Sequence, residues 1–160
     1  MSATQTKTLR FNRHFKASQE AVFRAWTDPQ QLTKWWGANG FTTPFAEIDL
    51  KVNGRYRIAM QPRVGPVQYL SGIYVEVKPP ERLVMTWSSQ GSQRHDGYES
   101  LLTIEFIAHG AATTEVMLTH ERLPDSHVRD FDAGWIATLE HLDQYLQVHA
   151  WHVPQSRSIR

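Results

Sequence analysis

The sequence predicts one α+β domain in which two short helices precede an antiparallel meander and a single long helix closes the chain. Three observations support this prediction. Residues 45–121 contain one short apolar alternation after another, separated by turn signals such as VNGR, KPPER and AHGAAT. Residues 131–146 place apolar side chains at intervals of three and four, which is typical of a helix. Two helix-capping signals lie before the first of these alternations.

The composition limits the classes of function. With 17 basic and 16 acidic residues, the chain has no net field that would gather nucleic acid or an anionic membrane. It contains no cysteine, which excludes disulfides and thiolate chemistry and is compatible with a reducing compartment. The N-terminal residues MSATQTKTLR are polar, and no stretch reaches the roughly 20 apolar residues of a membrane span. We therefore expect a cytoplasmic protein that neither binds nucleic acid nor inserts into a membrane.

The first strand and the first helix are expected between residues 8 and 27. The segment TLRFNRHF, residues 8–15, alternates apolar and polar side chains imperfectly, which favours a strand over a helix. Ser18 is a suitable N-cap for a helix that ends near Thr27. Its apolar positions recur at spacings of three and four, at Ala21, Val22, Ala25 and Trp26.

The stretch DPQQLTKWWG, residues 28–37, predicts a second short helix. Asp28 is its expected N-cap, Pro29 occupies the first helical position, Gln31 completes a capping box and Gly37 is the left-handed stop. Neighbouring side chains on a helix point about 100° apart, so two adjacent indoles cannot share a direction there.

The adjacent tryptophans at the end of this helix are therefore expected to play different parts. We expect Trp36 to point into the domain and Trp35 to lie toward the exposed side of the helix. An exposed Trp35 would be a natural contact for a symmetric homodimer. The alternative is that both indoles simply cover the sheet.

The meander is expected to contain strands in GRYRIAM, VQYLSGIYVEV, RLVMTW, SLLTIEFI and TEVMLTHE. In the first of these, Tyr56, Ile58 and Met60 share one face, whereas Arg55 and Arg57 share the other. One face is thus expected to be buried and the other solvated. A nucleic-acid platform would need aromatic side chains beside the arginines on the same face, so the arginine face is expected to be ordinary sheet surface.

The last predicted helix runs for about 24 residues to Ala150. A length of about 36 Å nearly equals the diameter of such a domain, so the helix must cross the entire sheet. Gly134 within it costs about 1 kcal/mol relative to alanine, which predicts a close backbone approach, a bend or room beside Trp135. We expect residues 1–150 to form the domain and residues 151–160 to be a flexible tail.

Several longer stretches resemble a known family. They are VFRAWTDPQQLTKWWG, GRYRI, PPERLVMTW, GYESLLTIEF, MLTHERLPD and GWIATLEHLDQYL, in the family order, and the resemblance extends from residue 9 to about residue 148. With them the chain resembles the START-like, birch-pollen-allergen-like superfamily of helix-grip domains. Within it, the chain is similar to the family named for the activator of heat-shock protein 90 ATPase. The resemblance implies a curved antiparallel sheet wrapped around the terminal helix, with an apolar pocket between them.

The resemblance leaves several functions open. The eukaryotic activator carries an additional N-terminal chaperone-binding domain, which we expect this chain to lack, so the chain is similar to a stand-alone form of the C-terminal type. The superfamily includes lipid carriers, hormone receptors, polyketide cyclases and scaffolds. A stress-response role with a heat-shock chaperone as partner is therefore one implication among several.

No catalytic motif has the right spacing, since the chain has no GxSxG, no P-loop and no GxGxxG. His120 is the best single candidate, because it alternates with Val116 and Leu118 and could transfer a proton inside the grip. The alternative is a core histidine bonded to a backbone carbonyl or a tyrosine. His149 and His152 have the spacing of a metal-binding pair but lack a third ligand, so we expect no metal and no cofactor.

The expected function is non-enzymatic: a soluble helix-grip protein that holds a small hydrophobic or aromatic ligand between the sheet and the last helix. The alternatives are a co-chaperone-like module that regulates a heat-shock ATPase, and a cyclase or hydrolase with a histidine acid or base. A register shift of one residue would turn any strand residue outward. The ligand-binding residues are expected at inward positions, namely Trp36, Tyr56, Ile58, Tyr69, Trp87, His120, Trp135 and Leu139.

Overall fold

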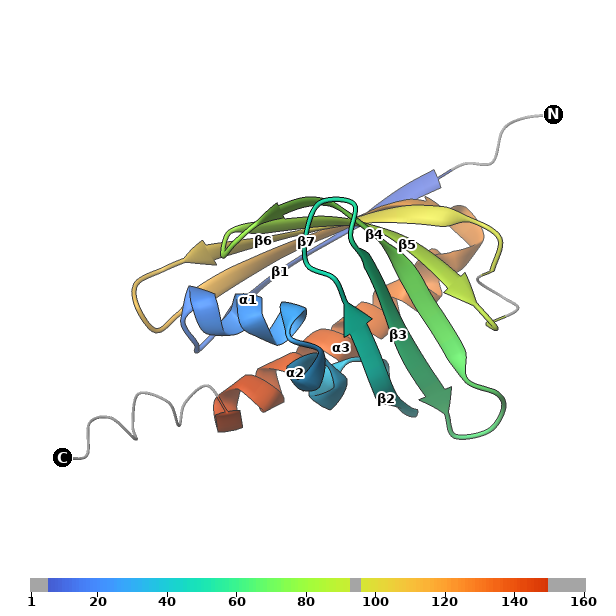
Figure 1. The fold of residues 1–160 in the computed structure, drawn as a ribbon, viewed down its shortest axis with the longest axis horizontal. Coiled ribbons are helices and arrows are strands. Elements are labelled where there is room, and N and C mark those ends of the chain that lie inside the picture. The colour runs from blue at the N-terminus through green and yellow to red at the C-terminus, as the bar shows by residue number, and fades with distance from the viewer. Residues whose placement is uncertain (1–5, 93–95, 150–160) are drawn as a thin grey trace.

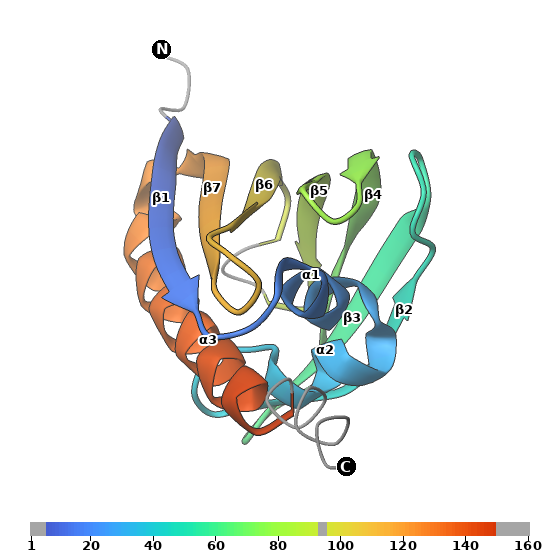
Figure 2. The same cartoon turned by 90° about the vertical axis from the view of Figure 1, so that its left-hand side faces the viewer.

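Seven strands form one curved antiparallel sheet. A computed structural model describes residues 6–92 and 96–149. Figure 1 and Figure 2 show the sheet as an arch with β1 at one edge and β2 at the other, in the order β1-β7-β6-β5-β4-β3-β2. The strands are β1 (Thr6–Phe15), β2 (Phe41–Ile48), β3 (Arg55–Pro62), β4 (Gln68–Lys78), β5 (Arg82–Gln90), β6 (Glu99–Ala108) and β7 (Thr114–Pro124).

The sheet combines local hairpins with one long-range pairing. From β2 to β7 each strand pairs with the next along the chain, as a meander requires. β1 instead pairs with β7, from Thr6 opposite Pro124 to Phe15 opposite Thr114. The expected meander is thus confirmed, although β2 begins at Phe41 rather than near residue 45.

Two short helices, α1 (Gln19–Thr27) and α2 (Pro29–Trp35), follow β1 and have the expected N-caps. The expected capping box is wrong, because Gln31 Nε2 donates to Asp28 Oδ2 at 3.3 Å and the Asp28 backbone N–H is bonded to the Arg24 carbonyl oxygen instead. Ser18 Oγ accepts a hydrogen bond of 3.1 Å from the backbone N–H of Ala21. Asp28 serves both helices, because its backbone N–H ends α1 and its Oδ1 accepts from Gln30 N at 3.0 Å to begin α2. Gly37 follows with a φ of 111°, a left-handed conformation that glycine adopts without steric cost.

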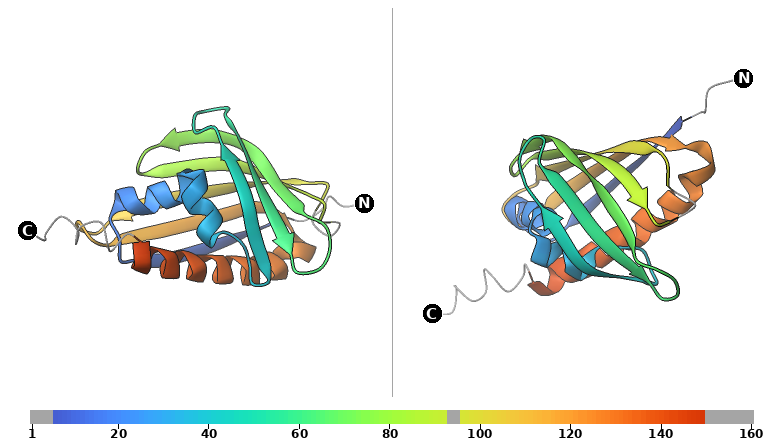
Figure 3. Two further views of the ribbon diagram at one scale, coloured as in Figure 1. Left: turned by 60° about the horizontal axis from the view of Figure 1, so that its bottom comes forward. Right: turned by 45° about the vertical axis from the view of Figure 1, so that its right-hand side comes forward.

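The long helix α3 (Val128–His149) crosses the concave side of the sheet, as Figure 3 shows, after the 3-10 turn η1 (Asp125–His127). Its buried row consists of Trp135, Thr138, Leu139, Leu142 and Leu146. Arg13 Nη2 on β1 lies 2.8 Å from Glu140 Oε1 and 3.3 Å from Asp143 Oδ2, which fastens the outer side of α3 to the sheet edge. The expected tail, residues 151–160, lies outside the described residues.

The core lies between the concave face of the sheet and the three helices. Side chains that are at most 1 % exposed come from both layers, including Phe15, Leu70, Leu102, Ile104, Leu118 and Leu142. Burial of large apolar side chains supplies most of the stabilisation of such a fold. In the described part of the chain, no helix combines the length and apolarity needed to cross a membrane.

The two adjacent tryptophans are both buried, so the expected difference between them is wrong. Trp35 is 2 % exposed and Trp36 is 7 % exposed. The Trp35 indole N–H also donates a hydrogen bond of 3.1 Å to the carbonyl oxygen of Ala25. The physical reason is that α2 ends at Trp35, while Trp36 has extended backbone angles of φ −67° and ψ 142°, so the rule for neighbours on a helix does not apply. Because Trp35 is buried, it does not offer the exposed surface on which the expected homodimer contact depended.

Candidate functional site

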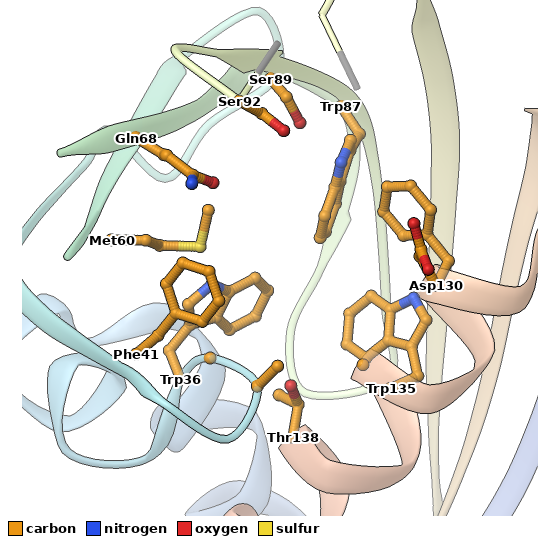
Figure 4. Close-up of a pocket in the computed structure, with 14 residues that line it drawn as sticks. Trp36, Phe41, Met60, Gln68, Trp87, Ser89, Ser92, Asp130, Trp135 and Thr138 are labelled. Atoms are coloured by element: carbon orange, nitrogen blue, oxygen red, sulfur yellow. The ribbon is translucent and has the colours of Figure 1, made fainter. Parts of the chain in front are cut away.

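A cavity of about 360 Å³ lies between the sheet, the loop that joins α2 to β2, and α3. Figure 4 shows that side chains from all three parts converge on it. The lining residues are Trp36, Gly37, Ala38 and Phe41 from the C-cap of α2, the loop after it and the start of β2, Met60, Gln68, Trp87, Ser89 and Ser92 from the sheet side, and Asp130, Phe131, Gly134, Trp135 and Thr138 from α3.

Three indoles form the aromatic wall of the cavity. The ring centroids of Trp36 and Trp87 are 5.9 Å apart, those of Trp36 and Trp135 are 5.8 Å apart, and those of Trp87 and Trp135 are 5.5 Å apart. These distances are typical of favourable aromatic pairs. Trp26 lies behind this wall, with its ring centroid 5.8 Å from that of Trp36 and 4.8 Å from that of Trp35. The wall is thus backed by rigid core, which holds its shape in place.

Polar groups lie at the ends of this apolar space. In Figure 4, Gln68, Ser89 and Ser92 gather at one end, whereas Thr138 lies at the opposite end. Asp130 lies beside Trp135 on the α3 side. An apolar cavity with a few polar groups at fixed positions is the usual form of a small-molecule site, because the walls bind and the polar groups orient.

Gly134 gives the cavity its room on the α3 side. A Cβ atom at this position would meet no heavy atom within 4 Å, even though the neighbouring Trp135 is only 3 % exposed. Of the three explanations expected for this glycine, the structure shows room beside Trp135. The helix gives up about 1 kcal/mol of propensity at this position.

The loop that closes one side of the cavity is fastened to α3 by His141. One ring nitrogen, Nδ1, lies 2.9 Å from the Gly37 carbonyl oxygen, and Nε2 lies 3.0 Å from Asn39 Oδ1. The next strand adds a contact, because Thr43 Oγ1 donates to the Trp36 carbonyl oxygen at 2.9 Å. The loop that leads into Phe41 is therefore held by α3 on one side and by β2 on the other.

His120 lies inside the grip, but one layer behind the cavity. It is 0 % exposed and does not line the cavity. Its ring packs against Trp87, Phe131 and Trp135, which do line it, with centroid distances of 4.7, 5.2 and 6.0 Å.

Both ring nitrogens of His120 are occupied. Nδ1 accepts a hydrogen bond of 3.0 Å from the Trp135 indole N–H, so the proton of the neutral ring is on Nε2, which lies 2.8 Å from Ser100 Oγ. Burial lowers the pKa of His120 to about 3. Both nitrogens of this neutral imidazole thus have protein partners, and the ring does not line the cavity. The arrangement favours a structural role over the acid or base considered from the sequence.

Three of the other expected ligand-binding residues belong to the packed core. Tyr56 and Ile58 border a separate space of only about 10 Å³. The Tyr56 hydroxyl donates to the Thr86 carbonyl oxygen at 2.5 Å, and burial raises the pKa of this phenol above its usual range. Leu139 is 4 % exposed and is absent from the cavity lining. These side chains support the wall without reaching the cavity.

Tyr69 was expected to face inward, and the structure places it on the outer face. The guanidinium carbon of Arg57 lies 3.9 Å from the centre of its ring, on the solvated side of the sheet. The reason is strand alternation: Leu70 is 0 % exposed and points inward, so its neighbour must point outward. An aromatic side chain thus does accompany an arginine on this face, contrary to the expectation from sequence.

The histidine pair considered as metal ligands is only half described. His149 Nδ1 lies 3.0 Å from the Tyr145 carbonyl oxygen, and the two rings stack at 4.2 Å. His152 lies outside the described residues.

Sequence reasoning placed Trp36, Trp87 and Trp135 at the cavity and missed the rest of its lining. Helical periodicity could have predicted Phe131 and Thr138, because residues 131, 134 and 138 lie on the same face of α3 as Trp135. Met60 shares the inward face of β3 with Ile58, and Gln68 pairs with it on β4. For Phe41, the first residue of β2, the sequence carries no such signal.

Comparison with known proteins adds a family and several similar folds. The family model for Activator of Hsp90 ATPase homolog 1-like protein matches residues 16–147. A solved AHSA1 protein of Silicibacter pomeroyi is 27 % identical, with 89 % of this chain and 99 % of that one covered and a TM-score of 0.75. A protein of Chromobacterium violaceum is 26 % identical, with 86 % and 96 % covered and a TM-score of 0.73.

A protein of Nitrosomonas europaea has the same fold at 22 % identity, with 88 % of this chain and 94 % of that one covered and a TM-score of 0.75. No curated protein matches the chain significantly.

Proposed function

This chain belongs to the family of Activator of Hsp90 ATPase homolog 1-like proteins, and we propose that it binds a small aromatic molecule between the sheet and α3. The observation that carries the proposal is the cavity of about 360 Å³ that three indoles line and Gly134 keeps open. Its volume lies within the range of about 300 to 1,000 Å³ that is usual for small-molecule sites.

The walls favour a flat ligand. Indole faces and edges pack well against another aromatic ring at centroid distances of 4.5 to 7 Å. The contiguous wall of Trp36, Trp87 and Trp135 offers such surfaces to the hollow seen in Figure 4, and Phe41 and Met60 extend its apolar lining. A branched sterol or a long acyl chain would use these surfaces less fully.

The polar ends favour a ligand with a hydroxyl or carbonyl group at its rim. Gln68 offers an amide donor and acceptor, and Ser89 and Ser92 offer hydroxyl groups. Thr138 offers a third hydroxyl, at the opposite end. A phenolic or polyketide-like aromatic compound fits this distribution, with its ring body against the indoles.

The surroundings of the cavity support holding a ligand rather than converting it. The histidine considered for catalysis, His120, is neutral, fully bonded and behind the wall. We therefore propose a carrier or sensor, in which the bound molecule is kept from water and released unchanged.

A matched pair of substitutions on α3 tests the proposal. Gly134→Leu places a side chain in the open space of the cavity, whereas Ala133→Leu places the same side chain on the exposed side of the helix. Thermal shift and tryptophan fluorescence are measured with 2-naphthol and polycyclic phenols, and with fatty acids and sterols for comparison. We expect an aromatic class to stabilise the wild type and Ala133→Leu, and its affinity for Gly134→Leu to fall at least about tenfold, or 1.4 kcal/mol.

Two outcomes would contradict the proposal. One is that no ligand class shifts the melting temperature or the emission of the wild type. The other is that Gly134→Leu, folded by circular dichroism, binds as tightly as the wild type.

The family name raises a second candidate, a chaperone-regulating module. The observation in its favour is the match of the activator family model to residues 16–147. It is tested by the ATP turnover of an Hsp90-type chaperone with and without a saturating amount of the protein. A change in turnover that Gly134→Leu leaves intact would favour this candidate over ligand binding, and unchanged turnover would exclude it.

A further inference from the structure

Two histidines and a glutamate converge on the outer face of the sheet, away from the cavity. His14 lies on β1, Glu115 lies on β7, and His109 lies in the turn between β6 and β7. One nitrogen or oxygen atom from each residue lies within 4.8 Å of the corresponding atoms of the other two. Among the described residues, no other three His, Asp or Glu side chains gather so closely.

The pairing of the sheet edge creates this cluster. His14 and Glu115 are direct partners in the antiparallel pairing of β1 with β7, so their side chains leave the same face side by side. The backbone N–H of His109 donates to the Thr113 carbonyl oxygen at 2.9 Å and closes the turn next to them. Residues far apart in the chain are thus held together by backbone hydrogen bonds that do not depend on the side chains.

One carboxylate oxygen faces both imidazoles. Glu115 Oε1 lies 2.8 Å from His109 Nε2 and 3.9 Å from His14 Nε2. The other oxygen, Oε2, accepts a hydrogen bond from the Asn12 side-chain amide. Asn12 therefore orients the carboxylate and leaves the first oxygen for the histidines.

The carboxylate is the least exposed of the three groups, and its two oxygens have different partners. Its side chain is 15 % exposed, whereas the rings of His14 and His109 are 58 % and 47 % exposed and can adjust their positions.

We propose that His14, His109 and Glu115 form a zinc-binding site, with Asn12 as its positioning residue. Zinc prefers imidazole nitrogen and carboxylate oxygen at about 2.0 to 2.2 Å, which separates tetrahedral ligand atoms by about 3.3 Å. The distances of 2.8 and 3.9 Å to Glu115 Oε1 lie on either side of that value. Small rotations of two exposed rings therefore complete three ligands, and water supplies the rest.

The ion would join the edge strand to the neighbouring hairpin. β1 is paired on one side only, and a metal that bridges His14 to β7 and the β6–β7 turn adds a link at that edge. Because zinc would bind the folded chain in preference to the unfolded one, it should raise thermal stability. This site lies on the opposite face from the cavity, so its occupancy is separate from the proposed ligand binding.

Metal titration of the full chain, prepared without a histidine tag and treated with chelator, tests the proposal. Calorimetry with Zn²⁺ and visible absorption with Co²⁺ should show one ion per chain, with an increase in melting temperature. His14→Gln, His109→Gln and Glu115→Gln should each weaken binding at least about tenfold, and Asn12→Ala by about tenfold. His149→Gln, which removes an exposed histidine at the end of α3, is the control and should leave binding unchanged.

Two of the three ligand substitutions change exposed imidazole rings, and the third, Glu115→Gln, keeps the size of its side chain, so circular dichroism should report a native fold for each. Absence of binding to the wild type at millimolar Zn²⁺ would overturn the proposal. Undiminished binding to His14→Gln would do so as well, since it would reduce the cluster to an ordinary ion pair between His109 and Glu115. Binding that is lost in His149→Gln would place the ion at the C-terminal end of α3 and overturn it too.

Discussion

The indole N–H of Trp135 on α3 donates a hydrogen bond of 3.0 Å to Nδ1 of His120 on β7. The bond fixes the ring tautomer and directs Nε2–H toward Ser100 Oγ on β6, 2.8 Å away. Helix and sheet are therefore joined by a polar contact inside an otherwise apolar core. Such a contact specifies one orientation of α3, because leaving either partner unpaired would cost about 1 to 3 kcal/mol.

The first prediction concerns stability against pH. The pKa of His120 is about 3 in the folded chain and about 6.5 in the unfolded one, so its contribution to stability is complete above about pH 6.5 and is lost as the pH falls toward 3. We expect the free energy of unfolding to fall by up to about 1.4 kcal/mol per pH unit in this window. Urea denaturation of wild type and His120→Gln measures it, since the variant should lack this slope. Equal slopes in the two proteins would contradict the prediction.

The second prediction concerns the adjacent tryptophans. Trp35 is 2 % exposed and bonded to Ala25, so Trp35→Ala should lower the free energy of unfolding by about 3 to 5 kcal/mol. Trp36→Ala should cost no more, because its indole already borders the cavity on one side. Guanidinium titration of both variants at two protein concentrations tests this. A loss of only about 1 kcal/mol for Trp35→Ala would show that this indole is not an anchor of the core.

The third prediction concerns Gly134. Because a Cβ atom at this position meets open space, Gly134→Ala should stabilise α3 by about 0.5 to 1 kcal/mol without strain. Ala133, the exposed residue before Gly134, provides a control: Ala133→Gly should lower the free energy of unfolding by a similar amount. Denaturant titration of the two variants gives both values. Destabilisation by Gly134→Ala would mean that the space beside Trp135 is closed in solution.

The fourth prediction concerns the loop at the cavity. His141→Leu removes the contacts of the ring with Gly37 and Asn39, so amide hydrogen exchange in residues 37–41 should accelerate. The rest of α3 should keep its protection. Gln144→Leu, which changes an exposed side chain one turn further along, is the control and should leave the loop unchanged. Unaltered exchange in His141→Leu would show that other contacts hold the loop.

Local signals in the sequence predicted most of the fold correctly. Ser18 and Asp28 begin their helices as expected, because a cap requires only a few adjacent residues. His120 faces inward as predicted, because it alternates along β7 with the buried residues Val116 and Leu118. The apolar row of α3 likewise follows from periodicity alone. These features depend on neighbours in the chain, which a single sequence displays.

Two orientations of aromatic side chains were predicted wrongly. The two indoles of residues 35 and 36 share the core because the chain leaves helical geometry between them, which periodicity does not reveal. Tyr69 was predicted to face inward. Its neighbour Leu70 is the buried residue instead, so strand alternation places Tyr69 on the outer face beside Arg57.

The sequence by itself determined the order of the elements, their caps and the inward positions of Trp36, Trp87 and Trp135. Only the tertiary structure decided that these indoles leave a hollow, because volume depends on how a curved sheet and a straight helix diverge. It also decided the meeting of His14 with Glu115, since pairing of the first strand with the last closes a loop that no local pattern encodes.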